Sequence, residues 1–217
     1  MTRTTSPEAL ARALGLLVVT DEALPPGRDL VATVRAALRG GAGSIQLRAK
    51  TAGASEQVEL ARVLLAETRA AGALLFVNDR VDVALAAGAD GAHVGEDDLP
   101  VDAARRISPP GFLLGASAAT PELALQAEAD GADYVGTGPV HATLSKDDAG
   151  DAVGTERIAA VAAAVRIPVV GIGGIALSNA AGVVRAGGAG VAVISAVVRA
   201  ADPEAATREL LRAVTVR

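Results

Sequence analysis

Two lysines stand out in this chain, because 20 of its residues are basic and only Lys50 and Lys146 are not arginine. Lys50 ends the segment 46–50, Gln-Leu-Arg-Ala-Lys, directly after a short apolar run. Lys146 ends the segment 143–146, Thr-Leu-Ser-Lys, within a stretch rich in glycine and aspartate. A lysine ammonium is a compact charge that suits a point contact to a phosphate oxygen. The two segments therefore predict contacts with a phosphorylated ligand.

Carboxylates follow two other apolar runs. Asp79 comes directly after Asn78, and Asp98 ends the run Glu96-Asp-Asp. Magnesium is typically held by one or two carboxylates together with substrate phosphates and water. The chain has no cysteine and two histidines, which favours oxygen ligands over a thiolate or histidine-rich centre. The alternative interpretation is that Asp79 and Asp98 only cap the helices that follow them.

Glycines and hydroxyl groups occupy comparable positions further along. Gly171-Ile-Gly-Gly174 follows an apolar run and is expected to open a helix, where backbone N–H groups can face an anion. Ser117 and Ser195 end two more apolar runs. His93 lies inside a strand-like run and is interpreted as structural, whereas the role of His141 stays open.

The elements that must position these residues repeat along the chain as a helix-like run, a glycine, a short apolar run and a polar end. Glycine ends helices readily because it adopts the left-handed conformation, and continuous apolar runs suit strands covered on both faces. The pattern predicts strands at about 15–20, 43–47, 73–77, 91–94, 112–116, 133–137, 168–172 and 191–195. It predicts helices at about 29–40, 55–71, 80–87, 101–107, 121–130, 155–165, 178–187 and 203–215.

Eight alternating strands and helices predict an α/β fold, a closed parallel (β/α)8 TIM barrel formed by residues 1–217 as a single domain. An open doubly wound sheet is the alternative. In such barrels the catalytic groups lie at the C-terminal ends of the strands, which is where the residues above fall. The least regular segment, 138–154, has a composition that suits a mobile lid.

Composition excludes several classes of function. The net charge is about −5 and no basic tract is present, which argues against nucleic acid or an anionic membrane as the partner. Aromatic residues make up 1% of the chain, so bases have no stacking platform. No apolar stretch approaches the length of a membrane span, and the N-terminus lacks a signal-peptide core. We expect a cytoplasmic protein with small-molecule substrates; a homo-oligomer is compatible with the sequence.

The order and spacing of these segments resemble the thiamine-phosphate synthase family over nearly the whole chain. The matching stretches are 46–50, 77–79, 93–98, 115–117, 136–139, 143–146, 170–174 and 194–195. The resemblance implies a transferase of thiamine biosynthesis. Such an enzyme couples 4-amino-2-methyl-5-(hydroxymethyl)pyrimidine diphosphate with 4-methyl-5-(2-phosphoethyl)thiazole to give thiamine phosphate and diphosphate.

The resemblance also implies roles for individual residues. Arg48, Lys50, Ser117 and Lys146 would be catalytic, and Asp79 and Asp98 would hold Mg²⁺. The substrate-binding set would be Gln46, Leu47, Arg48, Ala49, Lys50, Asn78, Ser117, Thr143, Leu144, Ser145, Lys146, Gly174, Ile194 and Ser195. The family's reaction is dissociative: diphosphate leaves first and the thiazole nitrogen traps the pyrimidine-methyl cation. Such a step needs charge stabilisation and placement rather than a general base.

The sequence departs from the usual family pattern at three places. Glu96 replaces a glutamine, His141-Ala142 replaces an aromatic-proline pair, and Ser145 replaces a threonine. A thiazole tautomerase is the nearest rival function, with His141 as its acid or base. A phosphate-sugar isomerase or epimerase, or a regulator that binds a phosphate ligand without turnover, are the others. The tautomerase does not need Lys50, Asp79 and Asp98, and an isomerase or epimerase would leave Asp79 and Asp98 without a joint role. A regulator would bind its ligand without turnover.

Overall fold

Eight parallel strands close into a barrel in the computed structural model, which describes residues 5–142 and 152–215. Each strand pairs with the next along the chain, and the last pairs with the first. The closed barrel predicted from the sequence is confirmed, and the open sheet is wrong. The strands are β1 (Leu16–Val19), β2 (Ser44–Leu47), β3 (Leu74–Asn78), β4 (Gly91–Val94), β5 (Leu113–Ser117), β6 (Tyr134–Thr137), β7 (Val169–Ile172) and β8 (Gly190–Val193).

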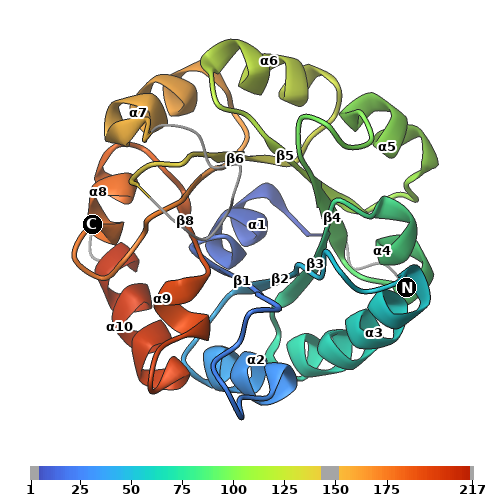
Figure 1. Ribbon diagram of the computed structural model, residues 1–217. Coiled ribbons are helices and arrows are strands. Elements are labelled where there is room, and N and C mark those ends of the chain that lie inside the picture. The colour runs from blue at the N-terminus through green and yellow to red at the C-terminus, as the bar shows by residue number, and fades with distance from the viewer. Residues whose placement is uncertain (1–4, 143–151, 216–217) are drawn as a thin grey trace.

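Helices surround the barrel, as Figure 1 shows in a view along its axis. They are α1 (Pro7–Ala13), α2 (Leu30–Arg39), α3 (Ala54–Ala71), α4 (Val81–Ala87), α5 (Val101–Ile107), α6 (Pro121–Ala129), α7 (Gly154–Ala164), α8 (Ala180–Arg185), α9 (Ser195–Val198) and α10 (Pro203–Thr215). Eight of these match predicted helices. The sequence interpretation missed α1 and the four-residue α9, because neither has an apolar face long enough to show a period.

Several helix ends follow directly from local sequence. The Thr120 hydroxyl accepts a hydrogen bond from the N–H of Leu123, and Pro121 occupies the first position of α6. Gly72 and Gly88 end α3 and α4 with φ of 72° in the left-handed region. An alanine at either glycine would be strained there. These signals explain why the predicted bounds of α3, α4 and α6 lie close to the observed ones.

Side chains alternate between two apolar layers. One layer lies between the strands and the outer helices. The other fills the barrel and includes Leu17, Val19, Leu74, Phe76, Leu113, Tyr134, Val170, Ala192 and Ile194. Because successive residues of a strand point to opposite faces, the alternation decides which polar side chains enter the barrel. Gln46 pairs with Val19 and Phe76 of the inner layer, so Gln46 points inward.

Helix α1 closes one end of the barrel. Leu10 and Leu14 belong to the inner apolar layer, and α1 lies across the centre of the ring in Figure 1. The Ser44 hydroxyl, at the start of β2, donates to the carbonyl of Ala13 at 3.0 Å. These contacts place α1 at the N-terminal ends of the strands. A ligand site in the barrel therefore opens at the C-terminal ends.

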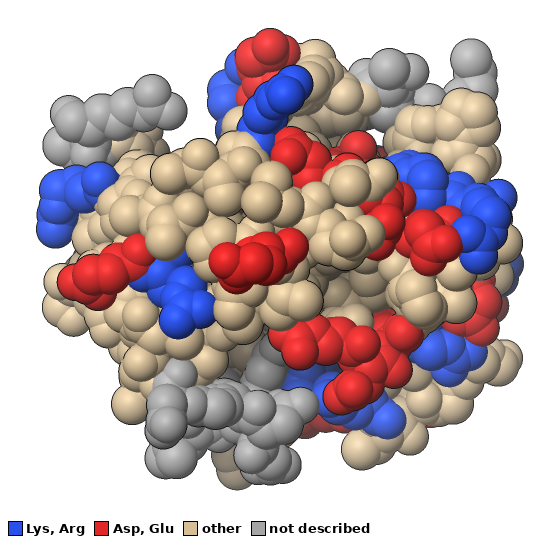
Figure 2. All heavy atoms as spheres, turned by 90° about the horizontal axis from the view of Figure 1, so that it is seen from above, with Lys and Arg blue, Asp and Glu red and all other residues tan. Residues whose placement is uncertain are grey.

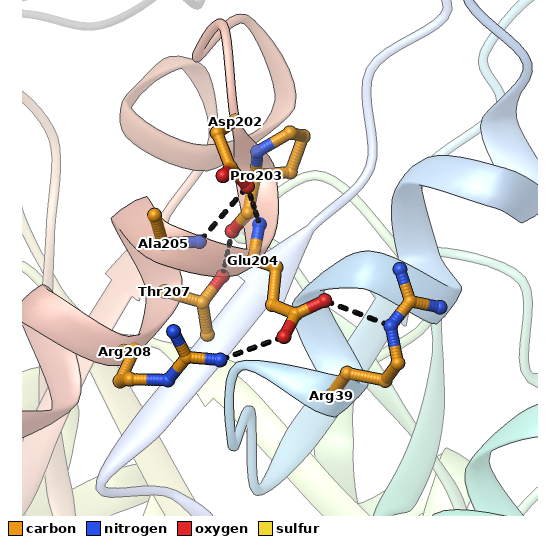
Figure 3. A network of polar contacts seen from close by, with 7 residues as sticks. All are labelled: Arg39, Asp202, Pro203, Glu204, Ala205, Thr207 and Arg208. Carbon is orange, nitrogen blue, oxygen red and sulfur yellow. Dashed lines mark hydrogen bonds and ion pairs between the residues drawn. The ribbon is translucent and has the colours of Figure 1, made fainter.

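Helices α2 and α10 close the outer ring through a polar network (Figure 3). The Glu204 carboxylate accepts from Nε of Arg39 at 2.8 Å and from Nη2 of Arg208 at 2.6 Å. The hydrogen bond from Arg39 lowers the pKa of Glu204. Asp202 caps α10 by accepting from the N–H groups of Glu204 and the next residue. The helix predicted over 203–215 is confirmed as α10.

The outer surface carries charges of both signs. Figure 2 shows acidic and basic side chains interspersed over one side of the barrel, with uncharged surface between them. Pairs within one helix contribute to this pattern, such as Arg62 with Glu59 at 2.7 Å. In residues 5–142 and 152–215, we find no helix with the length and apolar character that crossing a bilayer requires.

Candidate active site

Polar side chains from neighbouring strands meet inside the barrel near its C-terminal end. Asn78 of β3 pairs with His93 of β4, and Ser117 ends β5 beside Gly136 of β6. Alternation directs the side chains of Gln46, Asn78, His93 and Ser117 into the barrel. The structure therefore brings together Gln46, Asn78 and Ser117, three residues that the sequence placed in the site.

The end of β2 is fixed by hydrogen bonds to its backbone. The Thr20 hydroxyl accepts from the N–H of Arg48 at 2.9 Å and donates to the carbonyl of Arg48 at 3.3 Å. The amide of the buried Gln57 donates to the carbonyls of Ala49 and Ala52, both at 2.9 Å. The segment 46–50 is thus held in one conformation from both sides, as a preorganised binding loop requires.

Glu22, on the segment after β1, holds the far end of this loop. Its carboxylate accepts from the N–H of Lys50 at 3.0 Å, from the N–H of Thr51 at 3.1 Å and from the Thr51 hydroxyl at 2.8 Å. We call these contacts the Glu22 clamp. The clamp uses the backbone of Lys50, which leaves its ammonium for other partners. Sequence reasoning did not identify Thr20 or Glu22, because each contacts a residue 28 or 29 positions further along the chain.

Arg48 carries an unused donor. Two positions after the inward-facing Gln46, Arg48 continues the inner face of β2. In residues 5–142 and 152–215, its Nε is one of two buried side-chain nitrogen or oxygen atoms that have no hydrogen-bond partner. A buried donor without an acceptor is unfavourable in the protein alone. An anion at the mouth of the barrel would supply the missing acceptor, and guanidinium groups favour phosphate.

Asp79 follows β3 with a φ of 64°, in the left-handed region. Its N–H donates to the carbonyl of His93 at 2.7 Å, which ties the turn after β3 to β4. Helix α4 begins after Arg80, and its N-cap makes no side-chain hydrogen bond. Asp79 is therefore not the N-cap residue of α4. Non-glycine residues in this conformation are uncommon and often lie at functional sites.

Asp98 lies in the turn after β4. Its Oδ2 accepts from the N–H of Gly95 at 2.7 Å, and the N-cap of α5 is Pro100. Asp98 therefore organises its own turn and does not cap α5. Neither of the two candidate metal ligands is the N-cap residue of the helix that follows it. Since β3 and β4 are neighbours in the barrel, Asp79 and Asp98 follow adjacent strand ends.

The donor set fits magnesium better than a metal held by protein alone. In the described parts of the chain, three or more histidine, aspartate or glutamate side chains nowhere gather into a possible metal site. Magnesium commonly uses one or two carboxylates and takes its other ligands from substrate phosphates and water. The second oxygen of Asp98 and the carboxylate of Asp79 suit that arrangement, with a diphosphate supplying the rest.

The glycine turn after β7 differs from the sequence expectation. Gly173 and Gly174 have φ of 93° and 62°, but α8 begins at Ala180, so the turn does not open the helix. Asn179 explains the delay, because its side chain accepts from the N–H of Ala176 and donates to the carbonyl of Gly174. Asn179 is also the N-cap residue of α8.

The segment after β6 packs against this glycine turn. The N–H of His141 donates to the carbonyl of Gly173 at 3.0 Å, and a Cβ at Gly174 would lie 2.7 Å from that of His141. The Nε2 atom of His141 is the second of the two buried, unpartnered side-chain atoms. Strand β8 ends at Val193, and Ile194 is the N-cap of α9, so the exposed Ser195 begins a helix. The strand predicted to reach residue 195 thus ends two residues earlier, at Val193.

Part of the predicted site lies outside the described residues. The residues concerned are Thr143, Leu144, Ser145 and Lys146. Most of the predicted lid, 138–154, also lies outside the described residues. Of the other predicted residues, Leu47 is buried in the outer layer, while Ala49 and Lys50 follow β2. Lys50 is exposed at the strand end, next to the Glu22 clamp.

Together these features define a (β/α)8-barrel protein with polar and charged residues at the C-terminal ends of its strands. The thiamine monophosphate synthase family matches residues 16–197. The chain is 56% identical over 193 residues to the thiamine-phosphate synthase of Roseiflexus castenholzii, covering 89% of this chain and 85% of the relative. It is 54% identical over 200 residues to that of Moorella thermoacetica, covering 92% and 95%.

A solved structure gives the same result. The thiamine phosphate pyrophosphorylase from Pyrococcus furiosus superposes with a TM-score of 0.87 at 45% identity, covering 95% of this chain and 98% of the other. The chain belongs to the thiamine monophosphate synthase family and is a transferase of thiamine biosynthesis. The resemblance noted from the sequence is confirmed.

Proposed function

We propose that this chain couples 4-amino-2-methyl-5-(hydroxymethyl)pyrimidine diphosphate with 4-methyl-5-(2-phosphoethyl)thiazole, releasing diphosphate and forming thiamine phosphate. The observation that carries this proposal is the unpartnered Nε of Arg48 at the barrel mouth. A guanidinium with a buried free donor suits a diphosphate oxygen. The family supports the reaction type, and the residues around Arg48 support the order of events below.

Residues on β2, β3 and β5 bind the pyrimidine diphosphate in this proposal. Arg48 and Lys50 contact the diphosphate, and the hydroxyl of Ser117 donates to it. Gln46 and Asn78 point into the barrel below them and face the pyrimidine. The hydrogen bonds of Thr20 and Gln57 to the backbone of residues 48–52 hold the cations in place before substrate arrives. Preorganised charges need no rearrangement when the diphosphate departs.

Asp79 and Asp98 hold Mg²⁺ in the proposed complex. When bound, Mg²⁺ neutralises charge on the diphosphate. The left-handed backbone conformation of Asp79 fixes the position from which its side chain extends. The hydrogen bond from the N–H of Gly95 holds the carboxylate of Asp98. Glu96 is exposed, so its charge is largely screened by solvent.

The thiazole phosphate binds on the opposite side of the mouth. The glycine turn at Gly174 and the β8–α9 junction at Ile194 and Ser195 contribute backbone N–H groups to its phosphate. By resemblance to the family, Thr143 and Ser145 also bind the thiazole phosphate, whereas Lys146 contacts the diphosphate. Placing the thiazole nitrogen beside the pyrimidine methyl carbon allows it to trap the cation once diphosphate has left, without a general base.

A reaction with both substrates tests the proposal. The purified chain is incubated with the pyrimidine diphosphate, the thiazole phosphate and MgCl₂, and thiamine phosphate and diphosphate are measured together. We expect equal amounts of the two products. The variant Arg48→Met should lower kcat by roughly 10²–10³-fold, as loss of a donor aimed at developing charge does. Isomerisation of the thiazole without coupling would favour the tautomerase instead, and binding without any product would favour a regulator.

A further inference from the structure

A chain of polar side chains crosses the inside of the barrel beneath the proposed site. Nδ1 of His93 lies 3.1 Å from Oη of Tyr134, and Nε2 of His93 lies 3.2 Å from Oγ of Ser117. Tyr134 is fully buried. The hydrogen-bonded side chains therefore run from β6 through β4 to the end of β5. The sequence interpretation treated His93 as structural and gave Tyr134 no role.

Two glycines make room for the rings of this chain. Gly115 lies beside Tyr134 in the sheet, and a Cβ there would be 2.2 Å from Cζ of the tyrosine. A Cβ at Gly136 would be 3.1 Å from Cε1 of His93. Phe76 supports the tyrosine from the side, with ring centroids 5.3 Å apart in an edge-to-face contact. The barrel interior is thus built around this pair of rings.

The hydrogen bonds have one direction. Among the described residues, Nδ1 of His93 is the side-chain partner that the structure gives the phenolic oxygen of Tyr134, and a buried hydroxyl needs an acceptor. The phenolic hydrogen then points to Nδ1 of His93. A neutral imidazole with an acceptor at Nδ1 carries its hydrogen on Nε2. Nε2–H in turn donates to Oγ of Ser117, and the serine hydrogen is left for an acceptor at the mouth.

We propose that Tyr134 and His93 are positioning residues that fix the Ser117 hydroxyl as a hydrogen-bond donor toward the diphosphate. This inference rests on the proposed function, because it assigns the acceptor to the substrate of that reaction. With the opposite direction, Ser117 would donate to the imidazole and would present only lone pairs to an anion. A donor oriented in advance stabilises charge that develops as diphosphate leaves.

The variant Tyr134→Phe tests the inference, because it keeps the ring and removes only the hydroxyl. We expect kcat to fall about tenfold, with the KM for the thiazole phosphate unchanged, since the thiazole side of the mouth is untouched. No further loss should appear when Tyr134→Phe is combined with Ser117→Ala: the double variant should match Ser117→Ala alone. Independent losses that multiply in the double variant would show that Tyr134 does not act through Ser117.

Nitrogen-15 NMR of the imidazoles shows which nitrogen of His93 carries the hydrogen, and therefore the direction of its hydrogen bonds, without any turnover. The chain has two histidines, so His141→Asn assigns the signals of His93. We expect a protonated Nε2 and a bare Nδ1 in the unaltered protein, and a mixture of tautomers in Tyr134→Phe. A protonated Nδ1 in the unaltered protein would overturn the inference whatever the kinetics show.

Variants of His93 cover the case in which Tyr134→Phe does not fold. Gln at position 93 can place an amide N–H near the former Nε2, so His93→Gln should retain more activity than His93→Leu. Binding of inorganic diphosphate with Mg²⁺, measured by calorimetry, separates this inference from the proposed function. If coupling fails but His93→Leu and Ser117→Ala weaken diphosphate binding equally, the positioning role stands and the reaction was wrong. Unchanged diphosphate binding in both variants would refute the positioning role.

Discussion

Replacing Glu22 by alanine would remove the clamp while every residue that is proposed to contact substrate keeps its own side chain. The carboxylate accepts three hydrogen bonds from Lys50 and Thr51, at 2.8 to 3.1 Å. Without it, the two backbone N–H groups turn to water and the loop samples other conformations. The ammonium of Lys50 would then be placed correctly only part of the time, so we expect weaker binding of the diphosphate substrate.

The size of the effect follows from the number and exposure of these contacts. A hydrogen bond to a charged group contributes about 1.5–3 kcal/mol, and solvent at an exposed site lowers this to roughly 0.5–1 kcal/mol each. Three such contacts that share one carboxylate are not additive, so we take about 1.5–2 kcal/mol for the clamp. That corresponds to roughly a 10- to 30-fold fall in kcat/KM for the pyrimidine diphosphate. Thermal stability should change little, because the loop is exposed.

Three variants make the assay selective. Glu22→Gln keeps one acceptor oxygen and should lose less activity than Glu22→Ala. Glu59→Ala removes an exposed glutamate on α3 that pairs with Arg62, and should leave kcat/KM unaltered. Hydrogen exchange at the N–H groups of Lys50 and Thr51 should accelerate only in the Glu22 variants. If Glu22→Ala keeps its kcat/KM within twofold of the unaltered chain, the clamp does not position Lys50.

Three further outcomes are expected. Burial raises the pKa of Tyr134, the one tyrosine of the chain, so its ultraviolet titration should show no phenolate until the protein unfolds. The contribution of the buried, protonated Tyr134 to folding stability is complete below the unfolded pKa of about 10 and is lost as pH rises above it. A reversible phenolate signal near pH 10 in the folded protein would contradict the raised pKa. Gly115→Ala should destabilise by about 1–3 kcal/mol through the clash with Tyr134, whereas Gly182→Ala in α8, with its nearest atoms at 3.7 Å, should not lower the melting temperature. Asp79→Gly suits the φ of 64° and should preserve stability while greatly lowering activity; full activity would remove Asp79 from the metal site.

The sequence predicted the barrel because its evidence is local. Short apolar runs bounded by glycines give strands, and caps such as Thr120-Pro121 give helix starts. Strand ends in a parallel barrel gather at one edge, so Gln46, Asn78 and Ser117 could be grouped without coordinates. Helix α1 escaped because seven residues show little period, although its Ser6-Pro7 start is a cap signal.

What the sequence could not give is contact between distant segments. His93 in a strand-like run looks structural, and only the barrel closure brings it to Tyr134 and Ser117, 41 and 24 residues away. The Glu22 clamp likewise joins segments that are far apart in the sequence. The glycine turn was misplaced for a different reason: Asn179 holds residues 174–176 in a turn, which delays α8 to Ala180.

Metal binding gives the most direct test of the proposed site at Asp79 and Asp98. Manganese(II) takes the same oxygen ligands as Mg²⁺, and electron paramagnetic resonance measures its free and bound fractions in the presence of the pyrimidine diphosphate. Asp79→Asn and Asp98→Asn should each weaken binding at least about tenfold, the equivalent of 1.4 kcal/mol. Asp97→Asn, a change at the adjacent exposed carboxylate, should leave binding unaltered. Equal manganese binding by the unaltered chain and by the Asp79→Asn, Asp98→Asn double variant would contradict the proposal.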